Sequence, residues 1–273
     1  MIRLENVTKR YRPSNGRGQG TLALADVTLR VAEREFVCLL GPSGCGKSTL
    51  LNLVAGFIRP TAGRVLFQGR QVAGPGPERG VVFQDPTLFP WLTVRENVAF
   101  GLAAAGLARQ EQRRRAADCL RLVGLEGHDA AYPHALSGGM RQRAALARIL
   151  ALDPKALLMD EPFGALDANS RERLQDELVR IWQAHRRTVL FVTHNVEEAA
   201  YLADRVIVMG PPPGCAGAKP GSLRAARPVE LARPRDRGAS AMRAVVQELR
   251  SVLDALPCCV SRSPGESRDV DAT

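Results

Sequence analysis

The chain has 273 residues, of which 45% are hydrophobic, so it can bury the core of one large α/β domain or of two small ones. Its first residues form no apolar segment typical of a secretory signal, and no stretch approaches the ~18 consecutive apolar residues of a membrane span. These features exclude a membrane-spanning chain and wholesale disorder, and we expect a cytosolic protein.

The net charge of +10 comes almost entirely from arginine, since the chain has only Lys9, Lys47, Lys155 and Lys219. This skew accompanies abundant alanine and indicates coding bias more than nucleic-acid binding. The densest basic cluster, residues 113–115, lacks the aromatic side chains that stack on bases. It is a solvated helix face, a contact for an anionic membrane surface or partner, or a nucleic-acid contact. The six cysteines show no C-x-x-C pair, and neither they nor the four histidines have metal-site spacing.

The first elements in chain order predict a small antiparallel layer. Residues 2–7 and 27–31 have the pattern of strands, and the glycine-rich stretch 13–20 separates them as a loop. Residues 63–72 contain two short β-rich runs on either side of Gly69, which predicts a hairpin.

A phosphate loop follows the apolar run at residues 35–40. Residues 41–49 match G-x-x-x-x-G-K-[ST] between a predicted strand and a predicted helix, the context in which this pattern binds a nucleoside triphosphate. Glycines allow the backbone N–H groups to surround phosphate oxygens at a helix N-terminus. A glycine-rich turn without a ligand is the alternative. The predicted nucleotide-binding residues are Gly41, Pro42, Ser43, Gly44, Cys45, Gly46, Lys47, Ser48 and Thr49.

Continuous apolar runs predict strands that are buried on both faces of a parallel sheet. They lie at residues 81–83, 156–159, 189–192 and 206–209. Between Thr93 and Arg148 no strand is predicted, whereas residues 110–123 and 139–150 have helical periodicity. A helical insertion therefore interrupts the α/β core.

The C-terminal part changes character after Gly210. A run of prolines, followed by Gly, Ala and Arg residues, indicates that the regular core ends there. Residues 242–256 have the pattern of one more amphipathic helix, and the polar residues from 257 onward predict a frayed tail that includes Cys258 and Cys259.

Two acids end the predicted strand at residues 156–159. Parallel sheets present catalytic groups at the carboxyl ends of their strands, so Asp160 is a candidate to hold Mg²⁺ and Glu161 a candidate to polarise the attacking water. Without the phosphate loop, two such acids would more often be a solvated corner. The Ser48 hydroxyl of the phosphate loop is a candidate to complete the Mg²⁺ site.

Ser137, Gly138 and Gly139 lie in the helical insertion, just before the acid-ended strand. With their neighbours they resemble the signature sequence of ATP-binding-cassette (ABC) ATPases. The resemblance covers residues 1–256 and implies a P-loop NTPase (RecA-like) parallel-sheet core with an N-terminal antiparallel β layer and an inserted α-helical subdomain. The implied ATPase domain spans residues 1–240, with the helical subdomain at 93–150, a C-terminal helix at 241–256 and a disordered tail at 257–273.

The same resemblance implies roles for four more residues. Gln84 resembles the family's Q-loop glutamine, which implies that it is a further Mg²⁺ ligand. Asp167 resembles the D-loop aspartate and His194 the switch histidine, while Tyr11 occupies the place of the aromatic residue that stacks on adenine. Taken singly, such residues would more often be surface or structural. Together they appear in the family's order, so the predicted catalytic residues are Lys47, Gln84, Glu161 and His194.

The signature residues imply a dimer. One domain has no second nucleotide for the anion site at Ser137, Gly138 and Gly139, so the resemblance implies a head-to-tail homodimer in which each signature closes over the partner's ATP. Asp167 would couple the two sites.

Further resemblances narrow the family branch. Residues 78–85, 88–102, 194–199 and 233–237 are similar to the nitrate/sulfonate/taurine importer branch, whereas residues 214–218 depart from its pattern and leave the strand pairing there in question. The branch implies an ATPase at the cytoplasmic side of the inner membrane, with ATP and Mg²⁺ as cofactors. It would couple ATP binding and hydrolysis to the uptake of a small anionic solute. Its partners would be permease subunits and, indirectly, a periplasmic or lipoprotein solute-binding protein, with no nucleic acid.

Two other classes remain as alternatives, an ABC ATPase acting on nucleic acid or ribosomes and a non-hydrolysing regulatory module. The former usually has two cassettes or a long coiled-coil insertion, and the latter would normally lack Lys47, Glu161 or His194. The sequence does not identify the transported solute.

A loop after the predicted strand at residues 81–83 carries three apolar or aromatic residues. We expect Leu88, Phe89 and Trp91 to be exposed and to form a groove for a permease helix; packing inside the ATPase is the alternative.

Overall fold

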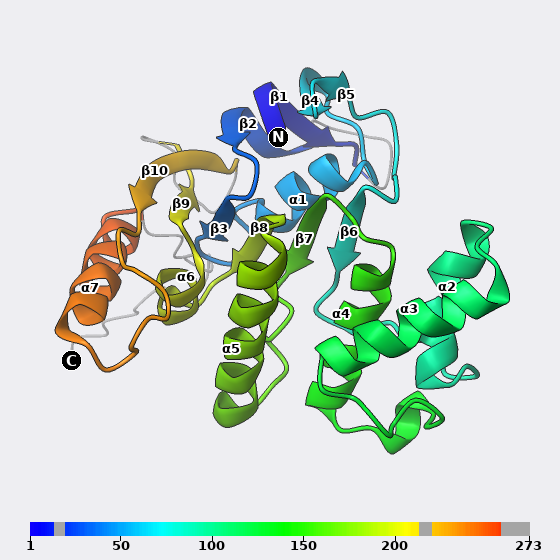
Figure 1. The fold of residues 1–273 in the computed structure, drawn as a ribbon. Coiled ribbons are helices and arrows are strands. Elements are labelled where there is room, and N and C mark those ends of the chain that lie inside the picture. The colour runs from blue at the N-terminus through cyan, green and yellow to red at the C-terminus, as the bar shows by residue number, and fades with distance from the viewer. Residues whose placement is uncertain (14–19, 213–219, 258–273) are drawn as a thin grey trace, which may run out of the picture.

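The computed structural model describes residues 1–13, 20–212 and 220–257, which form two sheets with helices around them (Figure 1). The N-terminal sheet is antiparallel and has the order β2-β1-β4-β5. Its strands are β1 (Ile2–Tyr11), β2 (Thr21–Val31), β4 (Ala62–Phe67) and β5 (Arg70–Gln71). Ile2 and Leu4 are buried and Arg3 between them is exposed, as expected for a sheet with one face on the core.

The central sheet has the order β10-β9-β3-β8-β7-β6. Its strands are β3 (Phe36–Leu40), β6 (Arg79–Val82), β7 (Ala156–Asp160), β8 (Thr188–Thr193), β9 (Arg205–Gly210) and β10 (Ser222–Pro228). The first five pair in parallel, and every residue of β3 and β8 is buried. The continuous apolar runs therefore predicted this sheet correctly, and the P-loop NTPase fold class is confirmed.

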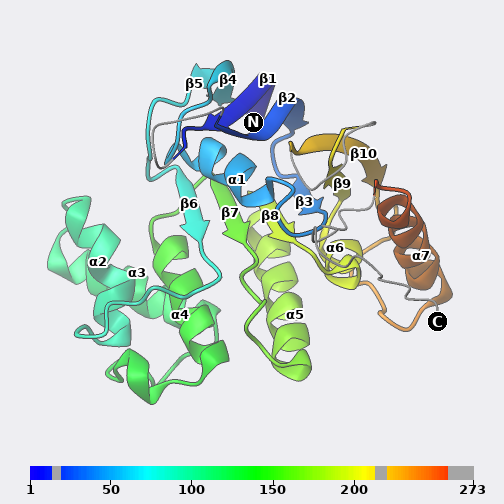
Figure 2. The same cartoon turned by 180° about the vertical axis from the view of Figure 1, so that it is seen from behind.

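Helices cover both faces of the central sheet (Figures 1 and 2). The helix α1 (Lys47–Ala55) packs between the two sheets and contacts strands of both. On the other face lie α5 (Ala168–His185) and α6 (Val196–Leu202). Alternate residues of β3 belong to the two resulting cores, with Val37 and Leu39 on the α1 side. Phe36, Cys38 and Leu40 belong to the core on the opposite side.

The helical stretch contains α2 (Val94–Ala104), α3 (Arg109–Leu122), a short 3₁₀ turn at Pro133–Ala135, and α4 (Gly138–Ala151). The sequence patterns indicated α3 and α4 but not α2. A capping box starts α2, because the Thr93 hydroxyl accepts from the Glu96 backbone N–H and the Glu96 carboxylate accepts from the Thr93 backbone N–H.

The expectation that the regular core ends after Gly210 is wrong. β10 pairs antiparallel with β9 and forms the edge of the central sheet, with Ala226 opposite Ile207. An edge strand is half exposed and needs no apolar run on both faces, so this arginine-rich segment gave no clear signal. Residues 214–218, whose pairing was in question, and all of the predicted tail 257–273 except Pro257 lie outside the described residues.

The last described helix is α7 (Ser240–Asp254), which packs against α6 through buried Met242 and Leu249. Within the residues that the structure describes, no helix is long and apolar enough to cross a membrane.

Candidate nucleotide site

The loop between β3 and α1 has the backbone shape that a phosphate requires. Gly44 and Gly46 have φ angles of 80° and 89°, in the left-handed region where glycine is favoured. A Cβ at Gly46 would lie 2.6 Å from a methyl of Leu24 and 2.9 Å from the carbonyl oxygen of Ala23, so a larger residue does not fit there. The loop then leads directly into the N-terminus of α1, which favours an anion.

Lys47 lies over this loop. Its ammonium group donates to the carbonyl oxygens of Gly41 and Pro42, at 2.7 and 3.0 Å, and the residue is 5% exposed. Cys45, within the loop, is buried. The positive charge is therefore held at the mouth of the phosphate loop.

Ser48 and Asp160 meet at the end of β7. The Ser48 hydroxyl donates to Asp160 Oδ1 at 3.0 Å, so the phosphate-loop helix and the acid-ended strand share one corner. Burial raises the pKa of Asp160, and the hydrogen bond from Ser48 opposes that shift. A hydroxyl and a carboxylate are oxygen ligands of the kind that Mg²⁺ prefers, so this pair fits the ion.

Glu161 and His194 come together because they follow neighbouring strands. The backbone N–H of Glu161 donates to the carbonyl of Val192 in β8, and Glu161 Oε2 lies 2.9 Å from His194 Nδ1. An ionised carboxylate can only accept, so this bond places a proton on Nδ1. Glu161 therefore orients the His194 ring at the edge of the site.

Gln84 and Tyr11 lie at two other edges of this region. Gln84 is exposed after β6, and a Cβ at Gly164 would stand 3.2 Å from its amide nitrogen, so it faces the loop after Glu161. The Tyr11 hydroxyl is 3.4 Å from the Thr49 hydroxyl, and its residue is 39% exposed. An aromatic ring is thus available beside the start of α1.

The signature residues occupy the N-terminus of α4. Ser137 caps the helix, because its hydroxyl accepts from the Met140 backbone N–H at 3.3 Å, and Gly138 and Gly139 form the first turn. A Cβ at Gly138 would lie 3.7 Å from a methyl of Leu166, next to Asp167. Among the described residues, no hydrogen bond or ion pair joins the signature to the phosphate loop, and α4 starts well away from α1 in Figure 1.

Asp167 caps α5 in the same way. Its carboxylate accepts from the Ser170 backbone N–H at 2.9 Å, and this bond lowers the pKa of Asp167. The residue therefore fixes the loop that connects Glu161 to α5.

Two positioning residues gave no signal in the sequence. Gln142 is buried in α4, and its amide donates to the carbonyl of Phe83 at 3.2 Å, which ties the signature helix to the strand before Gln84. Arg171 donates from Nε to the carbonyl of Phe163 and from Nη2 to that of Leu166, at 3.3 and 2.9 Å, and so holds the loop before Asp167. The carbonyl that Gln142 binds is distant in the chain, whereas those that Arg171 binds lie in the loop just before its own helix.

An aromatic groove lies between the core and the helical subdomain. Phe57 stacks on Phe83 with ring centroids 6.0 Å apart, and Phe89 packs on Phe100 at 4.5 Å. These four rings, with residues of β6 and α4, line a cavity of about 380 Å³. Trp91 is 71% exposed next to Phe89, as expected. Phe89 lines the groove as expected, although it is half-buried. The expectation for Leu88 was wrong, because it is half-buried against the main core and, like Trp91, does not line this cavity.

These features define an ATP-binding cassette, and the chain belongs to the ABC transporter family, whose model matches residues 24–164. It is 50% identical over 236 residues to an uncharacterized ABC transporter ATP-binding protein of Methanocaldococcus jannaschii, covering 86% of this chain and 85% of that protein. It is also 53% identical over 197 residues to the taurine import ATP-binding protein TauB of Rhizobium johnstonii, covering 72% of this chain and 75% of TauB.

Solved structures agree with this assignment. The ATP-binding cassette MJ0796, in a dimeric post-hydrolysis state bound to ADP and Pi, matches with a TM-score of 0.72 at 33% identity, over 85% of this chain and all of that one. The cassette cbiO1 of Clostridium perfringens, part of the ABC transporter complex cbiONQ, matches with a TM-score of 0.72 at 28% identity, over 84% of this chain and 88% of that one. The chain is therefore the ATP-hydrolysing subunit of an ABC transporter and resembles the taurine-import branch.

Proposed function

We propose that this chain drives an importer as a head-to-tail homodimer that encloses two ATP molecules. The observation that carries the proposal is the separation of the two anion-binding helix ends. The phosphate loop precedes α1, whereas the signature residues Ser137 to Gly139 cap α4 beside the loop before Asp167. A second copy, related by a two-fold axis, would bring its signature to the first copy's phosphate loop.

In this proposal each site residue has a distinct task. Lys47 and the loop amides hold phosphate, and Tyr11 stacks on adenine. Ser48 and Asp160, with Gln84, hold Mg²⁺, which neutralises charge on the phosphates when bound. Glu161 orients and deprotonates the attacking water, while His194 responds to the γ-phosphate through the ring that Glu161 orients.

We assign the aromatic groove to a permease helix. Phe57, Phe83 and Phe100 are 45%, 37% and 50% exposed, and aromatic side chains gathered on a surface are typical of protein interfaces. The permease would place the subunit at the cytoplasmic side of the inner membrane and receive its solute from a solute-binding protein. The taurine-import relatives support a small anionic solute, of the nitrate, sulfonate or taurine type.

The groove is tested with Phe100→Glu. Co-purification of the subunit with its cognate permease should fall at least ~10-fold, since a charge would replace a central interface aromatic. The control is Tyr132→Glu, because Tyr132 is an aromatic residue of similar exposure, 43%, outside the groove. Equal permease recovery with both variants would refute the assignment.

The solute class needs a separate test. Uptake of nitrate, taurine and alkanesulfonates is measured in vesicles that contain the permease and its binding protein. Transport of none of these, with a fully active ATPase, would refute the solute class and leave the ATPase assignment intact.

A further inference from the structure

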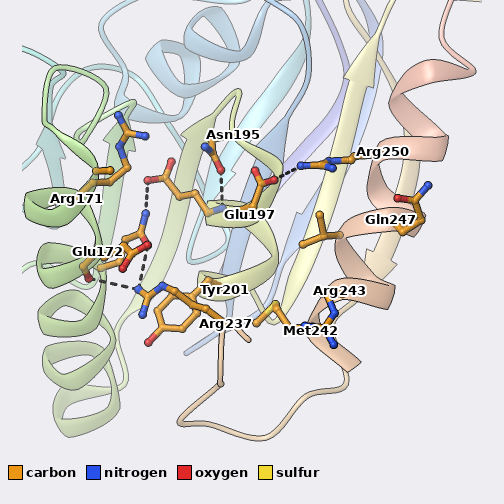
Figure 3. Close-up of a pocket in the computed structure, with 14 residues that line it drawn as sticks. Arg171, Glu172, Asn195, Glu197, Tyr201, Arg237, Met242, Arg243, Gln247 and Arg250 are labelled. Atoms are coloured by element: carbon orange, nitrogen blue, oxygen red, sulfur yellow. Dashed lines mark hydrogen bonds and ion pairs between the residues drawn. The ribbon is translucent and has the colours of Figure 1, made fainter. Parts of the chain in front are cut away.

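A second cavity lies on the opposite side of the subunit from the aromatic groove. It has a volume of about 520 Å³, within the usual range for small-molecule sites, and it opens between α5 and α7 with α6 as its floor (Figure 3). Figure 3 shows Arg171 and Glu172 on the α5 side and Arg243, Gln247 and Arg250 on the α7 side. None of the roles assigned above to ATP, Mg²⁺ or the permease uses this cavity.

The charges of the lining favour an anion. Of the residues that the structure describes, four arginines and three glutamates line the cavity: Arg171, Arg237, Arg243, Arg250, Glu172, Glu197 and Glu198. Two of the arginines are already paired, Arg250 with Glu197 and Arg237 with Asp176. Among the described residues, neither Arg171 nor Arg243 has a carboxylate within ion-pair distance. Both donate to backbone carbonyl oxygens, Arg171 to those of Phe163 and Leu166 and Arg243 to that of Gly238.

The acids of the lining offset this positive charge only in part. Glu172 is exposed at the cavity edge, and Glu197 is already paired with Arg250. Glu198 is 5% exposed and accepts from the Gln175 amide at 3.0 Å, and burial raises its pKa, which shifts it toward the neutral form. The side-chain amides of Asn195 and Gln247 add hydrogen-bond donors to the lining.

The lining also includes apolar groups. Met242 and Val246 from α7 and the methyl of Ala168 form this surface. Arg237 already covers the Tyr201 ring, with its guanidinium carbon 3.6 Å from the ring centroid. The cavity therefore suits an anionic group joined to an apolar body more than a free inorganic ion.

The cavity is connected to the hydrolysis machinery. Arg171, Asn195 and Glu198 line it and also line a small cavity of about 30 Å³ beside Glu161 and His194. Asn195 caps α6, directly after His194, by accepting from the Glu198 backbone N–H at 2.8 Å. A molecule in the larger cavity would thus touch side chains that contact the neighbours of both Glu161 and His194.

The contacts of Arg171 indicate whether a bound molecule would speed or slow hydrolysis. It donates to the carbonyls of Phe163 and Leu166 in the loop before Asp167. An anion offers the same guanidinium a charge-assisted bond, which is roughly twice as strong as a bond to a neutral carbonyl. Occupancy would weaken the hold on that loop and slow hydrolysis.

We propose that the cavity between α5, α6 and α7 is a regulatory site for a small organic anion with an apolar body, and that its occupation lowers ATP turnover. The effect on turnover rests on the ATPase activity, whereas binding to the cavity does not. The two can therefore fail separately.

The test titrates the full chain with 1-hexanesulfonate, 1-butanesulfonate and hexylammonium by calorimetry, and then measures ATP hydrolysis with each. Hexanesulfonate should bind more tightly than butanesulfonate by up to about 15-fold, from two more buried methylenes. It should lower turnover, and hexylammonium should do neither. Hexylammonium binding as tightly as hexanesulfonate, or no binding of either sulfonate, would overturn the proposal.

Variants locate the effect. Val246→Trp fills the cavity, and Arg243→Glu reverses a lining charge; each should weaken hexanesulfonate binding at least ~10-fold and remove its effect on turnover. The matched controls are Ala244→Trp on the exposed side of α7 and Arg173→Glu on α5, neither of which lines the cavity. Their binding should equal that of the wild type. Unchanged binding in both cavity variants, or binding that leaves turnover unaffected, would refute the regulatory site.

Discussion

Replacing Glu161 by glutamine removes basicity and keeps shape. The side chain is 22% exposed, and an amide oxygen can still accept from His194 Nδ1, so the local geometry should persist. A general base contributes about 10²–10⁴ to a rate, which corresponds to roughly 3–5 kcal/mol of the activation barrier. We expect Glu161→Gln to lower the turnover number by that factor while the ATP dissociation constant stays within about twofold of the wild-type value.

The assay is phosphate release at saturating ATP, with ATP affinity measured separately by calorimetry. Glu126→Gln is the control, because Glu126 is 64% exposed and its ion pair with Arg121 is 3.7 Å long. Surface changes of this kind have small effects, so its turnover should match the wild type. Glu161→Gln that keeps more than about a tenth of the wild-type turnover would refute the role of Glu161 as the base.

Two further predictions concern stability. Gly46→Ala should lower the free energy of unfolding and weaken ATP binding, by roughly 1–3 kcal/mol, because φ is 89° and the new Cβ meets Leu24. The control is Gly69→Ala, where φ is 79° and the Cβ would stand in open space, so only the backbone strain should lower stability. Equal losses in urea denaturation would show that the clash is unimportant. Because burial raises the pKa of Glu198, the native state holds this proton more tightly, and the resulting stability is lost as the pH rises through the raised pKa. Glu198→Gln lacks that loss, so its stability relative to the wild type should increase from about pH 4.5 to pH 7.5; a difference independent of pH would contradict this.

The sequence predicted the parts of the fold that local patterns determine. Continuous apolar runs are specific to strands buried on both faces, which is why β7, β8 and β9 were predicted within one or two residues. The phosphate loop was equally clear, because its glycines meet a local backbone requirement at Gly44 and Gly46. The edge strand β10 was missed, since half-exposed residues need no such pattern.

The site was predictable only where a residue belongs to a short motif. Arg171 and Gln142 resemble ordinary helix-surface residues in the sequence, and their tasks depend on carbonyls that the fold brings near. The prediction that Leu88 is exposed was wrong for a similar reason, because its local sequence does not show that it packs against the main core. The aromatic groove combines Phe57 and Phe100, which are far apart in the chain.

The central claim is that each phosphate loop is half of a site completed by a second copy. Gly139→Asp tests it, because the new side chain has space in its own chain, where a Cβ would lie 4.0 Å from the nearest atom, a methyl of Leu174. An acid is also tolerated at a helix N-terminus. Any effect must then come from repulsion of a triphosphate on the facing subunit.

The decisive measurement is sedimentation of Glu161→Gln with ATP, with and without Gly139→Asp. The single variant should form a dimer with ATP, and the double variant should bind ATP with the same affinity per chain but remain monomeric. A double variant that dimerises at the same ATP concentration, or that loses ATP binding as a monomer, would contradict the shared site.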